Sequence, residues 1–96
     1  MIVAVVFDDA GKDADIIEID KSVLDNIGIH KFEFCKWMFD KNNKHRYWRK
    51  TSNGSMYCAY RAEAFLEWLR DSGIDENAKL IEECASNIGN LPIIKF

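Results

Sequence analysis

The hydrophobic pattern at the start of the chain predicts two neighbouring strands. Residues 2–7 are an almost unbroken run of apolar residues, many of them β-branched, which is typical of a strand that is covered on both faces or lies in the middle of a sheet. Residues 8–14 contain three aspartates and Gly11, a composition that suits a turn. Residues 15–20 are short and again rich in isoleucine. We therefore predict that this second segment returns alongside the first as a hairpin.

Two helical segments are predicted to follow this hairpin. Asp20 or Ser22 can cap a short helix, and Gly28 is suited to end it. Residues 31–41 are aromatic enough for a strand, but their large apolar positions do not alternate. They share a Phe-x-x-Trp pattern with residues 65–68, which lie in a stretch rich in alanine, leucine and glutamate that is typical of a helix. We therefore predict a helix over residues 31–41, with a strand as the alternative.

A second hairpin is predicted around Asn53 and Gly54. This pair separates two β-prone segments, residues 45–50 and residues 55–60, and an Asn-Gly pair in such a place is the strongest short-range signal for a hairpin turn. The composition of residues 61–72 predicts that a helix follows directly.

The last part of the chain is predicted to contain one more helix and one more strand. Asp75 is suited to cap the helix, apolar residues recur at helical spacing after it, and Gly89 closes it. Residues 91–96 suit a short strand, in which Pro92 favours a place at the sheet edge. The predicted order is β-β-α-β-β-α-α-β, which indicates an α+β fold with helices packed on a mainly antiparallel sheet.

Length and composition indicate one domain in a reducing compartment. The chain has 96 residues, 48% of them hydrophobic, so residues 1–96 are expected to form a single domain with one core. The apolar run at the start has no basic flank and is too short for a signal peptide or a membrane span. Three cysteines without a CxxC motif suit free thiols rather than disulfides. These features predict a cytoplasmic protein without a membrane partner.

Charge is segregated along the chain. Residues 1–30 carry seven acidic and two basic residues, whereas residues 31–50 carry seven basic and two acidic residues. Opposite charge on different segments favours a protein that docks to another charged macromolecule. The acids at the first predicted turn do not have the spacing of an EF-hand, so no metal site and no cofactor are predicted. An exposed acidic loop also suits a basic partner, because carboxylates pair with arginine. This loop comprises Asp8, Asp9, Asp13 and Asp15.

Bases and aromatic residues are interleaved over residues 31–50. Single-stranded nucleic acid is bound by this combination, since bases of the nucleic acid stack on aromatic side chains and phosphates pair with cations. The same aromatic residues also have the spacing of a core face, and the whole chain carries a net charge of −3, which repels a polyanion. Nucleic acid is therefore not the expected partner, and a small nucleic-acid-binding regulatory protein is the alternative function.

No arrangement of residues in the sequence indicates catalysis. His30 and His45 are the only histidines, and no signature of a nucleophilic cysteine surrounds Cys35 or Cys58. The histidines and cysteines also lack the close pairs that form a zinc site. The motifs of serine hydrolases, nucleotide-binding loops and zinc proteases are absent. We therefore predict that the protein is not an enzyme and has no catalytic residues.

Three stretches, MIVAVVFDD, HRYWRK and AYRAEAFLEWL, carry a likeness that extends over the whole chain. With them the chain resembles the small immunity proteins of bacterial contact-dependent growth inhibition systems, which are polymorphic toxin systems. The resemblance implies a cytoplasmic protein without catalysis of its own. Such a protein binds the toxic C-terminal domain of a large secreted effector, often a nuclease, and blocks its active site or substrate groove. These families share no motif from which functional residues can be carried over.

The charge and aromatic content suggest which residues contact such a toxin. Nucleases are usually basic because they hold phosphates, so an acidic binder gains attraction and complementarity. Interface energy concentrates in a few aromatic anchors. Tyr47 and Trp48 are candidates, because adjacent strand residues cannot both enter one core face; a sheet covered on both faces is the alternative. The predicted toxin-binding residues are Asp8, Asp9, Asp13, Asp15, Glu18, Asp25, Tyr47 and Trp48.

Overall fold

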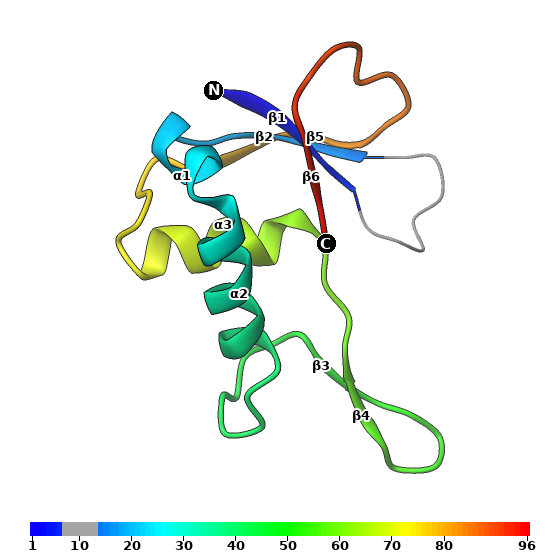
Figure 1. Ribbon diagram of the computed structural model, residues 1–96. Coiled ribbons are helices and arrows are strands. Elements are labelled where there is room, and N and C mark those ends of the chain that lie inside the picture. Colours follow the sequence, from blue (N-terminus) through cyan, green and yellow to red (C-terminus); the bar gives the residue numbers. More distant parts are fainter. Residues whose placement is uncertain (7–13) are drawn as a thin grey trace.

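Four strands from distant parts of the sequence form the main sheet of the computed structural model, which describes residues 1–6 and 14–96 (Figure 1). In spatial order the strands are β5 (Lys79–Ala85), β2 (Ala14–Glu18), β1 (Ile2–Val6) and β6 (Ile93–Lys95). Three helices lie on one side of this sheet, namely α1 (Lys21–Asp25), α2 (Ile27–Met38) and α3 (Ala62–Asp71). A separate two-stranded ribbon projects from the body and consists of β3 (Trp48–Lys50) and β4 (Met56–Cys58).

The main sheet is mixed. β1 pairs antiparallel with β2, as predicted for the first hairpin, and β2 pairs antiparallel with β5. β6 runs parallel to β1, with Ala4 opposite Ile93, so the sheet is not antiparallel throughout. The carbonyl of Pro92 accepts a 2.9 Å hydrogen bond from the amide of Ala4 just before this edge strand begins. The α+β class and the edge position of the last strand are therefore confirmed, and the first predicted turn lies almost entirely outside the described residues.

The helix predicted between Asp75 and Gly89 is wrong, because β5 occupies this segment. β5 supplies backbone partners to the outer side of β2, which would otherwise be left unpaired. Leu80 lies opposite Ile17 and packs against the core. The register between the two strands shifts twice, as in a β-bulge. A bulge interrupts the two-residue period of a strand, which explains why the apolar positions of this segment imitate helical spacing.

Helices form where the sequence predicts them before and after the second hairpin, but they begin and end at different residues than predicted. Asp20 caps α1, since its carboxylate accepts a 3.1 Å hydrogen bond from the amide of Ser22. Gly28 does not end a helix as predicted but lies inside α2, which begins at Ile27 and covers most of the predicted 31–41 helix. α3 forms as predicted. None of the helices in the described part of the chain is both long and apolar enough to cross a membrane.

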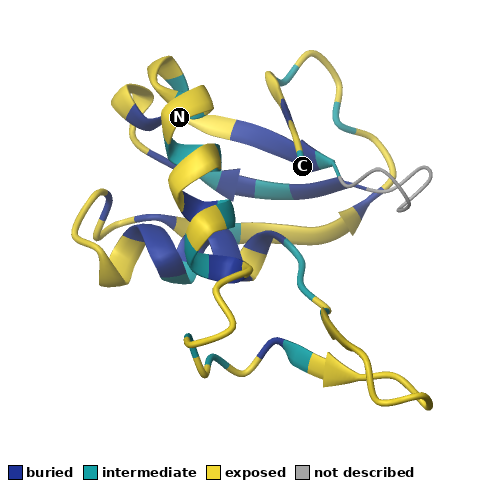
Figure 2. Ribbon diagram, turned by 60° about the horizontal axis from the view of Figure 1, so that its bottom comes forward, coloured by how far each residue is buried: buried dark blue, intermediate teal, exposed yellow. Residues whose placement is uncertain are grey.

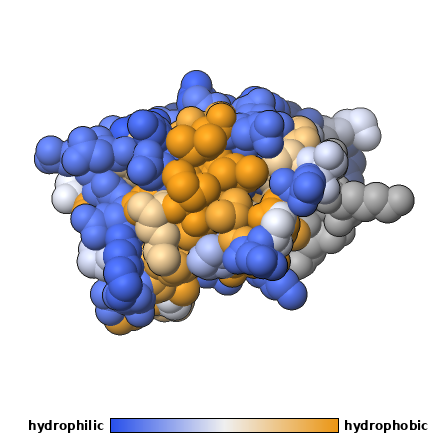
Figure 3. Space-filling view, turned by 90° about the horizontal axis from the view of Figure 1, so that it is seen from above, coloured by the Kyte–Doolittle hydropathy of each residue, from blue (hydrophilic) through white to orange (hydrophobic). Residues whose placement is uncertain are grey.

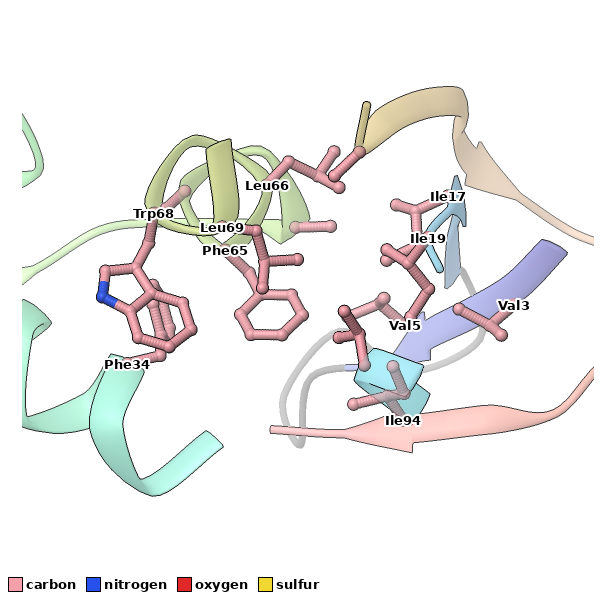
Figure 4. Close-up of a cluster of buried hydrophobic side chains, with 14 of the residues drawn as sticks. Val3, Val5, Ile17, Ile19, Phe34, Phe65, Leu66, Trp68, Leu69 and Ile94 are labelled. Atoms are coloured by element: carbon pink, nitrogen blue, oxygen red, sulfur yellow. The ribbon is translucent and has the colours of Figure 1, made fainter. Parts of the chain in front are cut away.

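The core lies between the helices and one face of the sheet (Figure 4). Figure 4 shows Phe65 in the middle of this cluster, between Val5 and Ile94 of the sheet and the rings of Phe34 and Trp68. Phe34 meets Phe65 and Trp68 edge to face, with ring centroids 5.4 and 5.9 Å apart. Such aromatic pairs add about 0.5–1.5 kcal/mol each to the free energy gained by burial. This cluster therefore fixes α2 and α3 against the sheet.

The second hairpin is confirmed, with strands shorter than predicted. Its turn is closed by a 2.8 Å hydrogen bond from the amide of Thr51 to the carbonyl of Ser55. Gly54 has φ +90°, a conformation that side chains other than glycine rarely adopt. Figure 2 shows that most of this ribbon is exposed.

Candidate functional site

A groove of about 750 Å³ lies between the projecting ribbon and the body of the protein. Arg46 and Arg49 line it from the ribbon side. Arg61 and Glu63 line it from the start of α3, and Glu83 lines it from β5. Three guanidinium groups thus share the groove with two carboxylates. Two of these guanidinium groups form ion pairs within the protein, Arg46 with Glu63 and Glu67 and Arg61 with Asp15, so the groove is lined by groups of both charges.

Asp15 lies beside this groove and joins three segments. Its buried carboxylate accepts hydrogen bonds from Nη2 of Arg61 at 2.6 Å, from the amide of Cys84 at 3.1 Å and from the amide of Ala62 at 3.3 Å. The Ala62 amide belongs to the first turn of α3, and the residue before that turn makes no capping bond of its own. Asp15 therefore caps α3 from β2. Cys84 lies at the bulge in β5 and has a φ of 54°, and its amide donates to Asp15 from this backbone conformation.

The environment of Asp15 corrects its predicted role. Its side chain is only 1% exposed, so it does not belong to an exposed acidic surface. Burial raises the pKa of this carboxyl, but the hydrogen bonds from Arg61, Cys84 and Ala62 and the charge of Arg61 outweigh burial, and the pKa is lowered from its ordinary value. Asp15 is ionised at neutral pH and supports the wall of the groove rather than a partner.

Tyr47 also lies in the interior and does not form an exposed anchor. Only 8% of its surface is exposed, and its ring belongs to the hydrophobic core. Its hydroxyl donates to Oε2 of Glu67 and accepts a 2.9 Å hydrogen bond from Nη2 of Arg46. Burial and the hydrogen bond to Glu67 raise the pKa of Tyr47. This network attaches the base of the ribbon to α3. Tyr47 is therefore a buried structural residue and not the exposed anchor that was predicted.

Trp48 remains partly exposed beside a second, smaller hollow. Its indole donates a 2.7 Å hydrogen bond to the carbonyl of Asn43, and its ring stacks on His45 with centroids 5.5 Å apart. The hollow has a volume of about 290 Å³ and is also lined by Lys41 and Lys44. Neither lysine makes an ion pair within the described residues. Basic and aromatic groups of the 31–50 segment thus meet at this hollow.

The remaining predicted residues are acidic. Glu18 pairs with Lys79 at 3.3 Å, and Asp25 pairs with Lys21 at 2.9 Å. Both pairs are exposed, so these carboxylates stay accessible to a partner. The structure does not bring them together with Asp15. The other three, which are Asp8, Asp9 and Asp13, lie outside the described residues.

Two exposed apolar side chains on the ribbon were missed by the sequence analysis. Met56 and Tyr57 are 51% and 48% exposed. Tyr57 lies opposite Arg49, and Met56 lies opposite Lys50, on the two faces of the ribbon. The signal that pointed to them was the Asn-Gly turn itself, because an isolated two-stranded hairpin presents both faces of its outer part to solvent.

Two further searches, for metal-binding groups among the described residues and for similar proteins, found nothing. Within residues 1–6 and 14–96, no group of three or more histidine, cysteine or acidic side chains could hold a metal ion. No protein-family model, no curated protein and no solved structure matches this chain.

Proposed function

We propose that this protein is an immunity protein of a bacterial contact-dependent growth inhibition system. On this proposal it acts in the cytoplasm without catalysis, and it binds the toxic C-terminal domain of a secreted effector, a nuclease whose active site or substrate groove it blocks. The observation that carries the proposal is the projecting ribbon. It carries two large, half-exposed side chains: Tyr57 lies opposite Arg49, which lines the larger groove, and Met56 lines the smaller hollow beside Trp48.

Such a ribbon suits insertion into a concave partner surface. Binding energy concentrates in tyrosine, tryptophan and arginine side chains that become buried at the centre of an interface. Tyr57 and Arg49 lie opposite each other on the ribbon and offer this combination. The hydrogen bonds between Tyr47, Arg46 and Glu67 hold the base of the ribbon, so little conformational entropy is lost when a partner binds.

The acidic residues have a different part in this proposal. Glu18 and Asp25 are exposed, and together with the acids of residues 8–13 they give the N-terminal part of the chain its negative charge. Long-range electrostatic attraction by these acidic residues accelerates the encounter with a basic nuclease and does not need direct contact. The ribbon then supplies the specific contacts.

The test is capture and rescue with the product of the gene that precedes this one. The tagged protein should capture the toxic domain in equimolar amount and restore growth of cells that express it. Tyr57→Ala should weaken binding by about 30-fold or more, the loss of roughly 2 kcal/mol that defines an interface anchor. Phe32→Ala is the matched control, since Phe32 is an exposed aromatic residue on α2, and it should bind normally. Failure of both capture and rescue would refute the immunity function.

The hollow beside Trp48 supports the second candidate, a small nucleic-acid-binding regulatory protein. Lys41 and Lys44 would contact phosphates there, and Trp48 would stack on a base. Binding to a generic single-stranded oligonucleotide should then fall steeply with salt. The double variant Lys41→Glu with Lys44→Glu should abolish that binding and leave toxin capture intact. These lysines are better targets than Arg46, whose loss would also disturb Tyr47.

A further inference from the structure

Helix α2 carries large apolar side chains on the side that faces away from the core. Phe34 and Met38 are completely buried and fix the helix to the body. On the other side, Ile29 and Phe32 are 64% and 63% exposed, and Phe39, which directly follows the helix, is 51% exposed. A helix that is apolar on all sides is usually covered on all sides. The outer side of α2 therefore requires an explanation.

The helix-free side of the main sheet also shows hydrophobic atoms in its middle (Figure 3), but it is less open than α2. Residues 86–92 join β5 to β6 and rise over this side of the sheet (Figure 1). Ala4 in the middle of the sheet is 0% exposed, and its register partner Ile93 is 49% exposed. The most exposed large apolar side chains of the described chain are thus those of α2.

Four exposed residues form an outer stripe on α2, namely Ile29, Phe32, Lys36 and Phe39. They follow one another at intervals of three, four and three residues, which is the a-d-a-d spacing of a coiled-coil seam. Residues at this spacing lie on one side of a helix. Lys36 is part of the stripe, since its ammonium nitrogen lies 5.6 Å from the ring centroid of Phe32.

We propose that the outer stripe binds a second copy of the chain, with the two α2 helices packed antiparallel around a two-fold axis perpendicular to them. An axis that passes midway between Phe32 and Lys36 sets Phe32 of each copy against Lys36 of the other. The same rotation sets Ile29 of each copy against Phe39 of the other. The contact then has an apolar pair at each end. In its middle each ammonium group meets an aromatic ring, as Lys36 and Phe32 already do within one chain.

Charge favours a second copy as the occupant of the stripe. Glu33 lies beside the stripe and pairs with Lys36 of its own chain at 3.9 Å. The two-fold rotation also brings Glu33 of each copy near Lys36 of the other, so neither charge is left without a partner in the contact. One acid and one base give the stripe no net charge that would attract a strongly basic or acidic protein, but they make it complementary to itself. A single lysine in such a seam weakens a helix pair and fixes its register.

The size of the contact indicates a weak dimer. α2 has 12 residues, so it is about 18 Å long and about 10 Å wide, with a footprint of roughly 200 Å². This is well below the ~800 Å² per partner that is usual for stable complexes. We therefore expect a reversible dimer that dissociates on dilution. The ribbon lies beyond the C-terminal end of α2 (Figure 1), so the antiparallel arrangement keeps the two ribbons apart and toxin capture does not need the dimer.

Sedimentation velocity over protein concentrations from about 10 µM to about 1 mM tests this inference in the absence of any toxin. The sedimentation coefficient of the unmodified protein should rise with concentration from that of a monomer towards that of a dimer. Phe32→Asp should raise the dimer dissociation constant at least about tenfold, because it places a charge in the contact. Ile81→Asp is the matched control, since Ile81 is also half-exposed but lies on β5, and it should dimerise normally.

A charge exchange separates this contact from association through other surfaces. Lys36→Glu alone and Glu33→Lys alone should each weaken dimerisation about tenfold, because like charges then meet at the axis, and the double variant should restore it. All three variants change exposed residues and should keep the circular dichroism spectrum of the fold.

Three results would overturn the proposal. The first is a protein that stays monomeric at every concentration. The second is dimerisation that Phe32→Asp or the single charge changes do not weaken. The third is loss of toxin capture by Phe32→Asp while the unmodified protein does not dimerise, because the stripe would then bind the toxin and not a second copy.

Discussion

Replacing Asp15 by asparagine tests the support of the groove most directly. Asparagine keeps the shape of the side chain but removes its charge and places an amide group where a donor now points. Asp15 accepts from Arg61, Cys84 and Ala62, and hydrogen bonds to a charged group contribute about 1.5–3 kcal/mol each. The full sum is not lost, because the side chain of Arg61 is 41% exposed and can be hydrated again. The Ala62 amide is buried and keeps a need for an acceptor.

The expected loss is about 3 kcal/mol in the free energy of unfolding at pH 7, a large part of the roughly 5–15 kcal/mol of a small domain. For a chain of 96 residues this corresponds to a fall in Tm of about 15 °C. Thermal and urea unfolding followed by circular dichroism measures both values. Asp25→Asn is the matched control: Asp25 also pairs with a cation, but on an exposed helix face, so its replacement should leave Tm unchanged within error.

The pH dependence of this difference gives a second, independent check. The pKa of Asp15 is lowered in the folded protein, so its ionised form stabilises the fold above the unfolded pKa of about 3.9. That stabilisation is lost as the pH falls through the lowered pKa of the folded state. The difference between the original protein and Asp15→Asn should therefore be complete at neutral pH and shrink in strong acid. A difference below about 0.5 kcal/mol at pH 7, or one that does not change with pH, would refute the role given to Asp15.

Three further predictions concern stability and reactivity. Gly54→Ala should destabilise the hairpin by about 1 kcal/mol, because Gly54 has a φ of +90°. Gly28→Ala should stabilise the fold by about 0.5–1 kcal/mol, because Gly28 lies inside α2 and an added Cβ meets no atom. If urea unfolding shows that both substitutions change the free energy of unfolding in the same direction, this reasoning is wrong. Tyr47→Phe should cost about 1 kcal/mol in the same assay, because it removes the hydroxyl that joins the ribbon to α3, and an unchanged midpoint would show that this bond is not needed. In a thiol titration with a disulfide reagent, the exposed Cys84 should react first and Cys58 later, because burial raises the pKa of Cys58; the reverse order would contradict the structure.

The elements that the sequence predicts well are those whose signals are local. The Asn-Gly turn, the cap at Asp20 and the composition of α3 act within a few residues, and the structure confirms all three. β5 was predicted as part of a helix because apolar residues recur at helical spacing between the possible cap Asp75 and Gly89. Its actual structure depends on β2, whose edge it completes, and on Asp15, which binds the amide of Cys84 from a distant part of the chain. No local signal carries that information.

At the candidate site, too, local sequence signals predict less than tertiary contacts determine. The structure buries Tyr47 and leaves Trp48 partly exposed, but Tyr47 lies in the turn before β3, so the rule for adjacent strand residues does not account for this difference. Which of the two is buried depends on Glu67 of α3, a tertiary partner that the pattern does not reveal. Met56 and Tyr57 are exposed because the ribbon forms a separate sheet, which follows from topology and not from residue type.

The pairing of β1 with β6 has a consequence for how fast the protein folds. Ala4 and Ile93 come from opposite ends of the described chain, so the sheet is complete only after a very long loop has closed. Topologies of such high contact order fold in milliseconds to seconds, whereas an isolated hairpin such as β3–β4 forms in about 1–10 µs. During the interval the β1–β2 pair presents an unpaired strand edge to other chains. Refolding at high concentration should thus aggregate through this edge, and dilution should suppress it.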